Sequence, residues 1–143
     1  MTQDELDLSV GYVLKRVQSA LRAAMDAALR EHGLTTPQYA CLELLDQRPG
    51  LSNADLARGA FVSRQSMNVV LRGLEENGLV ERPARAAQGR ALPVRLTAEG
   101  RERLRRAHAD VFEIERRMVD VLDPERVALL RADLTRMAEE LGG

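Results

Sequence analysis

The sequence has few of the features that mark secreted or membrane proteins. Cysteine occurs once in 143 residues, at Cys41, which excludes an internal disulfide framework. No apolar run approaches the roughly 20 residues that a membrane-spanning helix needs, and residues 1–5 lack the cationic and then apolar form of a signal peptide. These absences predict a cytoplasmic protein with one hydrophobic core, in a single domain over residues 1–143.

The motifs of the common enzyme classes are also missing from the sequence. It contains no phosphate-binding loop, no nucleophile beside a base and no cluster of metal ligands. Its two histidines, His32 and His108, show no ligand-like spacing with the cysteine or with acidic residues. We therefore expect no catalytic residues, no metal, no cofactor and no enzymatic activity.

Cys41 could suggest redox sensing, but its surroundings favour a different role. It lies in an apolar helical pattern beside Leu42 and Leu45, and no basic residue falls within one helical turn of it. Because reactivity requires a stabilised thiolate, we interpret it as a small buried hydrophobic side chain.

The sequence does contain two short helical patterns between residues 51 and 78. The first begins at Ser52, whose hydroxyl can cap free backbone amides, with Asp55 in its first turn. The second begins at Ser63 and ends at Asn77-Gly78, residues that tolerate the left-handed conformation of a helix stop. It carries one apolar stripe at helical spacing, formed by Met67, Val70, Leu71 and Leu74.

Two short strands are predicted next, at residues 79–82 and 92–96. The second alternates apolar and polar residues, and Pro93 restricts it to an edge position. The loop between them carries Arg85 and Arg90, which suit the negative potential of a DNA minor groove. The alternative for both arginines is a surface loop that contacts nothing. The whole pattern predicts a mainly α fold with a small β-wing, a winged helix-turn-helix.

The face of the second helix opposite its apolar stripe is polar and cationic. Such side chains can bond to base edges, contact a thymine methyl group or pair with phosphates. On an isolated helix they would more simply form a solvated surface, but their position between a turn and a wing favours DNA contact. The candidate residues on this helix are Ser63, Arg64, Gln65, Ser66, Asn68, Val69 and Arg72.

The charge distribution supports a nucleic-acid partner although the net charge is −1. Residues 58–95 contain seven arginines and three acidic residues, hence a formal charge of +4 for this segment. The acidic residues lie mainly in the terminal regions, which predicts a polar molecule with one cationic face.

Long helical patterns flank this segment. Apolar positions repeat at helical spacing from Leu6 to Glu31, with Gly33 as a stop, and again over residues 104–121. After Asp123-Pro124 the same spacing resumes over residues 127–141. These helices either pack within one protomer or form a two-fold dimer; the amount of apolar surface favours the dimer.

Several segments together resemble the MarR family of bacterial transcription regulators, over nearly the whole chain. The matching segments are Thr36-Pro37-Gln38-Tyr39, Leu56-Ala57, LEENGLVER at 74–82, Gly89-Arg90-Ala91 and LTAEG at 96–100. The resemblance implies a DNA-binding lobe over about residues 36–97 and dimerisation helices over about 5–32 and 98–141. It further implies a homodimer on a palindromic operator, with the second helix in the major groove and Arg90 in the minor groove.

The resemblance also bears on two further sets of residues. Gln88 stands where the family usually has an aspartate that holds the wing arginine, and an uncharged amide would hold Arg90 less firmly. The resemblance implies a small-molecule pocket where the leading helix, the helix after Pro37 and the long helix around Leu104 meet, the region of Tyr12, Arg16 and Tyr39. These side chains can equally belong to the core, and we assign no ligand-binding residues.

We therefore expect a dimeric transcriptional regulator, a repressor whose DNA affinity falls when a small aromatic or otherwise amphipathic effector binds. The alternative is a winged-helix protein-interaction module without sequence-specific DNA binding, which Gln88 slightly favours and the cationic segment opposes.

Overall fold

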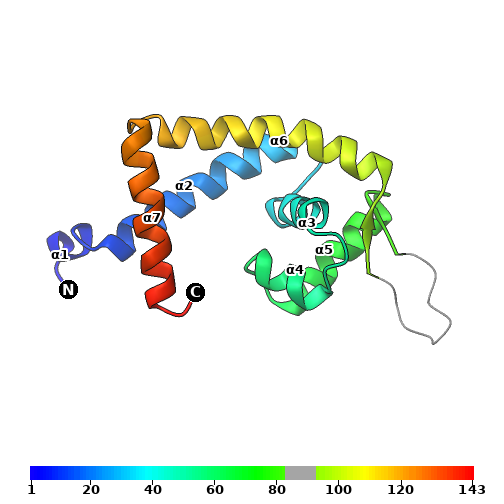
Figure 1. Ribbon diagram of the computed structural model, residues 1–143, viewed down its shortest axis with the longest axis horizontal. Helices are drawn as coiled ribbons and strands as arrows, with labels where there is room; N and C mark the ends of the chain where they lie inside the picture. Colours follow the sequence, from blue (N-terminus) through cyan, green and yellow to red (C-terminus); the bar gives the residue numbers. More distant parts are fainter. Residues whose placement is uncertain (83–92) are drawn as a thin grey trace. The chain divides into compact units, whose positions relative to one another are not determined.

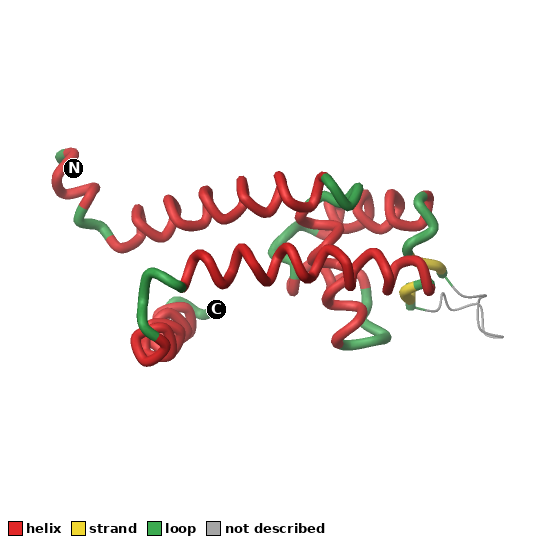
Figure 2. Tube along the Cα trace, turned by 90° about the horizontal axis from the view of Figure 1, so that it is seen from above, coloured by secondary structure: helices red, strands yellow, loops and turns green. Residues whose placement is uncertain are grey.

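The computed structural model describes residues 1–82 and 93–143, which are mainly helical with one small sheet (Figures 1 and 2). The described elements are α1 Gln3–Asp7, α2 Val10–Arg30, α3 Thr36–Gln47, α4 Asn53–Gly59, α5 Arg64–Glu76, β1 Val80–Glu81, β2 Arg95–Leu96, α6 Ala98–Val119 and α7 Pro124–Glu140. The chain forms two compact units, Met1–Val111 and Phe112–Gly143, and the boundary lies inside α6. The mainly α fold with a small β-wing is thus confirmed, and no described helix is long and apolar enough to cross a membrane.

The first unit has one hydrophobic core, to which α2 through α6 and both strands contribute. The apolar stripe of α5 is buried as predicted, with Met67 and Leu74 wholly inaccessible and Leu71 3% exposed. Val70 packs against this core at its edge. The fully buried large side chains are Leu29, Leu42, Leu56, Met67, Leu74, Leu79 and Cys41.

The leading helix is interrupted, so the prediction of one helix from Leu6 onward is wrong. α1 ends at Asp7, and Ser9 begins α2 by accepting a hydrogen bond from the backbone nitrogen of Tyr12 at 3.4 Å. A serine hydroxyl competes well for free backbone amides and therefore favours the start of a helix over its interior. Gly33 ends the region as predicted, with φ of 67°.

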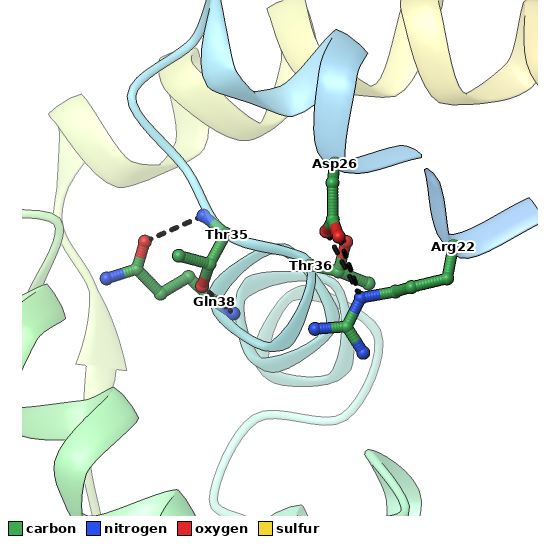
Figure 3. Close-up of polar contacts among 5 residues, drawn as sticks. All are labelled: Arg22, Asp26, Thr35, Thr36 and Gln38. Atoms are coloured by element: carbon green, nitrogen blue, oxygen red, sulfur yellow. Dashed lines mark hydrogen bonds and ion pairs between the residues drawn. The ribbon is translucent and has the colours of Figure 1, made fainter. Parts of the chain in front are cut away.

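Polar contacts join α2 to the start of α3 (Figure 3). The Thr36 hydroxyl donates to Oδ1 of Asp26 at 2.5 Å, and Nε of Arg22 bonds the same atom at 3.1 Å. The Thr36 hydrogen bond, more than the arginine, lowers the pKa of Asp26. Thr35 and Gln38 form a capping box that satisfies the first amides of α3.

The two strands are antiparallel and shorter than predicted. Val80 lies opposite Leu96 with both side chains buried, and Glu81 lies opposite Arg95 with an ion pair of 2.9 Å. The intervening segment, which contains Arg85, Gln88 and Arg90, lies outside the described residues.

A close backbone contact fixes the start of α6 against the sheet. The Thr97 hydroxyl donates to the carbonyl of Gly78 at 2.7 Å and accepts from the amide of Gly100 at 3.0 Å, so it also caps α6. The amide of Thr97 donates to the carbonyl of Leu79 at 3.1 Å. A Cβ atom on Gly100 would overlap that same Leu79 carbonyl oxygen.

Within the second unit, α7 begins at a conventional cap and buries none of its side chains. The carboxylate of Asp123 accepts from the amide of Arg126 at 2.9 Å, and Pro124 occupies the first turn, as predicted. Large apolar side chains are exposed there and on α2. They are Phe112, Val121, Leu129, Leu130, Met137 and Leu141 in the second unit, together with Val10, Val13, Leu14 and Val17 on α2.

We expect Gly100→Ala to lower the free energy of unfolding by at least about 2 kcal/mol, because the added methyl group must push the Leu79 backbone aside. Gly11→Ala in α2 is the matched control: its Cβ would lie 3.7 Å from the nearest atom outside its neighbours, the Ser9 hydroxyl oxygen. Removing that helical glycine should raise stability by up to about 1 kcal/mol. Urea unfolding of both variants measures the difference between their free energies of unfolding. Equal unfolding midpoints for the two variants would show that the close approach of Gly100 to the Leu79 backbone does not exclude a side chain.

Candidate nucleic-acid interface

The helix pair α4 and α5 begins at the two predicted serine caps. Ser52 and Asp55 form a capping box at α4, in which the Asp55 amide donates to the Ser52 hydroxyl at 3.1 Å. Ser63 accepts from the amide of Ser66 at 3.0 Å and donates its own hydrogen to the Ser66 hydroxyl at 3.0 Å. Ser63 therefore has a structural role at the start of α5, and the hydroxyl hydrogen of Ser66 remains available to a ligand.

The structure brings the polar residues of α5 together on one exposed face. Arg64, Gln65, Asn68 and Arg72 are all exposed, at spacings that place them along one side of the helix. Val69 lies among them with 62% of its surface exposed. Because the opposite stripe is buried, this face is held outward by the core.

Local ion pairs show which arginines of this segment are already engaged within the protein. Arg58 pairs with Asp55. Arg82 lies 3.2 Å from Glu75, and Arg95 lies 2.9 Å from Glu81. Arg64 and Arg72, by contrast, form no ion pair with any residue in the ranges 1–82 and 93–143. The arginines of this segment that have no ion pair in the described residues are thus both on α5.

The turn between α4 and α5 contains a residue that sequence reasoning overlooked. Phe61 has φ of 59°, in the left-handed region, and 95% of its surface is exposed. For a non-glycine residue this conformation costs on the order of 1 to 2 kcal/mol, and the exposed ring recovers little of that by burial. Phe61 lies two residues before the Ser63 cap, beside the candidate interface.

A side-chain contact across the helix pair also escaped the sequence analysis. Nδ2 of Asn53, the first residue of α4, donates a hydrogen bond to Oδ1 of Asn68 on α5. The other amide atom of Asn53, Oδ1, is buried and has no hydrogen-bond partner in the described parts of the chain. Fifteen residues separate the two asparagines, so neither helical periodicity nor a local motif signals their contact.

Both histidines have partners that their spacing in sequence did not reveal. Nε2 of His32 lies 2.6 Å from a carboxylate oxygen of Asp110, and the Arg103 guanidinium donates to the His32 carbonyl at 3.0 Å. Nδ1 of His108 hydrogen-bonds the Tyr39 hydroxyl at 3.2 Å. These contacts tie α6 to the ends of α2 and α3. Among residues 1–82 and 93–143, no three His, Cys, Asp or Glu side chains meet in a group able to hold a metal ion.

The three residues considered for a small-molecule pocket differ in their surroundings. Tyr12 and Arg16 line an open hollow along α2, and Tyr39 is not part of it. Tyr39 is only 7% exposed, and burial raises the pKa of its hydroxyl to about 12. A separate hollow of about 390 Å³ is lined by Glu43, Asp46, Gln47, Arg101, Leu104, Arg105 and His108 of α3 and α6.

Comparison with known proteins gives consistent similarities. A sequence model described as the MarR family matches residues 32–91. The HTH-type transcriptional repressor Rv2887 of Mycobacterium tuberculosis is 46% identical over 136 residues, 95% of each chain. The homoprotocatechuate degradative operon repressor of Escherichia coli is 27% identical over 132 residues, covering 92% of this chain and 86% of the other.

Solved structures give the same result. The M. tuberculosis MarR family protein Rv2887 in complex with salicylic acid has a TM-score of 0.72 at 46% identity and covers 94% of this chain and 96% of its own. Its complex with DNA has a TM-score of 0.71 at 43% identity, with 94% and 98% covered. The transcriptional repressor CouR bound to a 23-mer DNA duplex has a TM-score of 0.84 at 29% identity, with 96% and 98% covered.

We expect Cys41 to be inert in the native protein. Its side chain has no exposed surface, and burial raises the pKa of its thiol to about 12. A thiol reagent at pH 8 should react with it at least about 100-fold more slowly than with the unfolded chain. An exposed thiol introduced by Gln47→Cys is the control and should react at once; equally fast reaction of Cys41 itself would contradict its burial.

Proposed function

The chain belongs to the MarR family of transcriptional regulators, and from this premise we propose that it acts as a dimeric, sequence-specific repressor on DNA in the cytoplasm. The observation that carries the proposal is the outward face of α5, where Arg64 and Arg72 have no ion-pair partner in the described chain and flank Gln65 and Asn68. Cations of this kind pair with phosphates, and the amides between them suit base edges in a major groove.

The roles divide according to chemistry. Arg64 and Arg72 supply charge, Gln65 and Asn68 supply base contacts, and Ser63 and Ser66 sit at the helix N-terminus, where backbone amides attract phosphate. We assign Arg85 and Arg90 to the wing as minor-groove and phosphate contacts on the basis of the family resemblance and their charge.

Dimerisation supplies the second α5 helix that a palindrome requires. Large apolar side chains are exposed on α2 and throughout residues 112–143, and a second copy of the chain would remove them from water. Two-fold symmetry then places two α5 helices at half-sites about 34 Å apart, one turn of DNA.

A small aromatic acid is the effector class that we propose. The similar protein Rv2887 has been solved with salicylic acid and with p-aminosalicylic acid. An effector of this class would lower DNA affinity here by binding one dimer geometry more tightly than the DNA-bound geometry.

Selection of genomic DNA fragments by the purified protein, at physiological salt with non-specific competitor, tests the function. A recovered palindrome, released by salicylate, supports the regulator. Recovery of no shared motif would contradict it and favour the protein-interaction alternative.

Arg72→Ala should weaken binding to every DNA sequence by a similar factor. Because one phosphate contact is lost in each half of the dimer, the slope of log affinity against log salt should become shallower by about two units. Arg105→Ala in α6 is the matched control, since it removes the same charge from an arginine that already pairs with Glu102 at 2.5 Å. Equal salt slopes for both variants and the wild type would contradict the role of Arg72.

Gln65→Ala should change specificity more than overall affinity. A lost base contact is expected to cost about 1 to 3 kcal/mol at one position of each half-site, while binding to unrelated DNA stays within about twofold. Titrations with single-base operator variants measure this effect. A uniform loss across all variants would instead place Gln65 on the phosphates.

A further inference from the structure

A valine lies in the middle of the polar face of α5. Val69 is 62% exposed, and the face around it carries Gln65, Asn68 and Arg72. Resting on the proposed DNA-binding function, we propose that Val69 is a specificity-determining residue that packs against the C5-methyl group of one pyrimidine in each half-site. At that position the protein then distinguishes thymine from uracil and 5-methylcytosine from cytosine, so that its binding responds to cytosine methylation.

The geometry of the helix directs Val69 away from the core. Successive residues of an α-helix are rotated by about 100°, so side chains two residues apart point in directions about 160° apart. Val69 is two residues after Met67 and two before Leu71, and both of these side chains are buried. Val69 is therefore on the side of α5 opposite the buried stripe, and the packing of that stripe holds it outward.

The neighbours of Val69 on the helix surface are candidate DNA contacts. Gln65 lies one turn before it and Arg72 one turn after it, at spacings that place side chains next to each other. Arg72 forms no ion pair with any residue in the ranges 1–82 and 93–143. A partner that reaches both Gln65 and Arg72 therefore also covers Val69.

The fold gives this side chain no role of its own among the described residues. Val70 packs against the hydrophobic core, and Val69 does not belong to that cluster. A β-branched residue is also a weaker helix former than alanine. Single exposed apolar residues are common on protein surfaces, so it is the position of Val69 between two candidate DNA contacts that carries the inference.

Charge decides between DNA and a protein as the partner of this face. Arg64 and Arg72 share the exposed side of α5, and an apolar protein surface that covered Val69 would bury these guanidinium groups without partners, which is costly. DNA supplies phosphates for the arginines and methyl groups in the same groove for the valine. The apolar side chains that we assign to the dimer lie on other elements, α2 and residues 112–143.

The chemistry of the pyrimidines gives the specificity. In the major groove thymine presents its C5-methyl group, which suits an apolar contact, whereas cytosine presents an amino donor and no methyl group. Uracil is thymine without this methyl group, and 5-methylcytosine is cytosine with it, so each pair of bases isolates the contact. Covering one methyl group is expected to change the affinity about fourfold for one half-site and about 15-fold for both.

Val69→Ala is the test variant. It removes both γ-methyl groups from an exposed position, and because alanine is the better helix former, folding is preserved. Arg72→Ala is the control, since it weakens binding through charge and leaves Val69 in place. It should lower the affinity for every DNA but keep the ratio between methylated and unmethylated bases.

The probe is a duplex that carries the palindrome recovered by the genomic selection. Each thymine of one half-site, together with its symmetry mate, is replaced in turn by deoxyuridine, and each cytosine by 5-methylcytosine. Competitive titration with the wild type should find one position at which loss of the methyl group weakens binding, or its gain strengthens binding, about 15-fold. Val69→Ala should reduce this factor to about threefold or less.

The outcomes separate this inference from the function on which it rests. If the wild type selects a palindrome but no change of a methyl group alters its affinity, the inference is wrong and the repressor function stands. If one position responds and Val69→Ala keeps the full response, another side chain makes the contact and the inference is wrong. If Arg72→Ala reduces the response as much as Val69→Ala does, the methyl group acts through the shape of the DNA, which also overturns the inference. If the wild type binds no sequence preferentially, the proposed function and the inference both fall.

Discussion

The burial of one stripe of α5 is the constraint on which the candidate interface depends. Met67, Leu71 and Leu74 lie in the core of the first unit, so rotation of α5 about its axis would expose apolar surface at a cost of about 25 cal/mol per Å². The same packing therefore fixes the opposite face outward. Stability and presentation of the polar face are two results of one amphipathic pattern.

Contacts local in sequence were accessible to prediction, and contacts distant in sequence were not. Helical periodicity and capping residues located the starts of α4, α5 and α7, because a cap and its first turn lie within three residues of each other. Ion pairs such as Arg95–Glu81 and the His32–Asp110 contact require the tertiary fold. The net charge over residues 58–95 could therefore be counted from the sequence, but only the structure separated Arg64 and Arg72 from arginines already paired.

Residues of similar appearance in the sequence thus have different roles in the molecule. Ser63 caps α5 as predicted and also stays a predicted DNA contact, whereas Asn53 carried no signal in the sequence and contacts Asn68. Sequence pattern identifies which face of a helix is polar. Which side chains on that face already contact other parts of the protein is decided by the tertiary fold.

Phe61 has a side chain that the fold does not require. Its ring is almost wholly exposed and its backbone occupies a region that glycine adopts more easily. A glycine would satisfy that turn better, and folding gains almost nothing from the ring. Any selection for an aromatic residue at this position therefore acts on contacts with a binding partner and not on the stability of the fold.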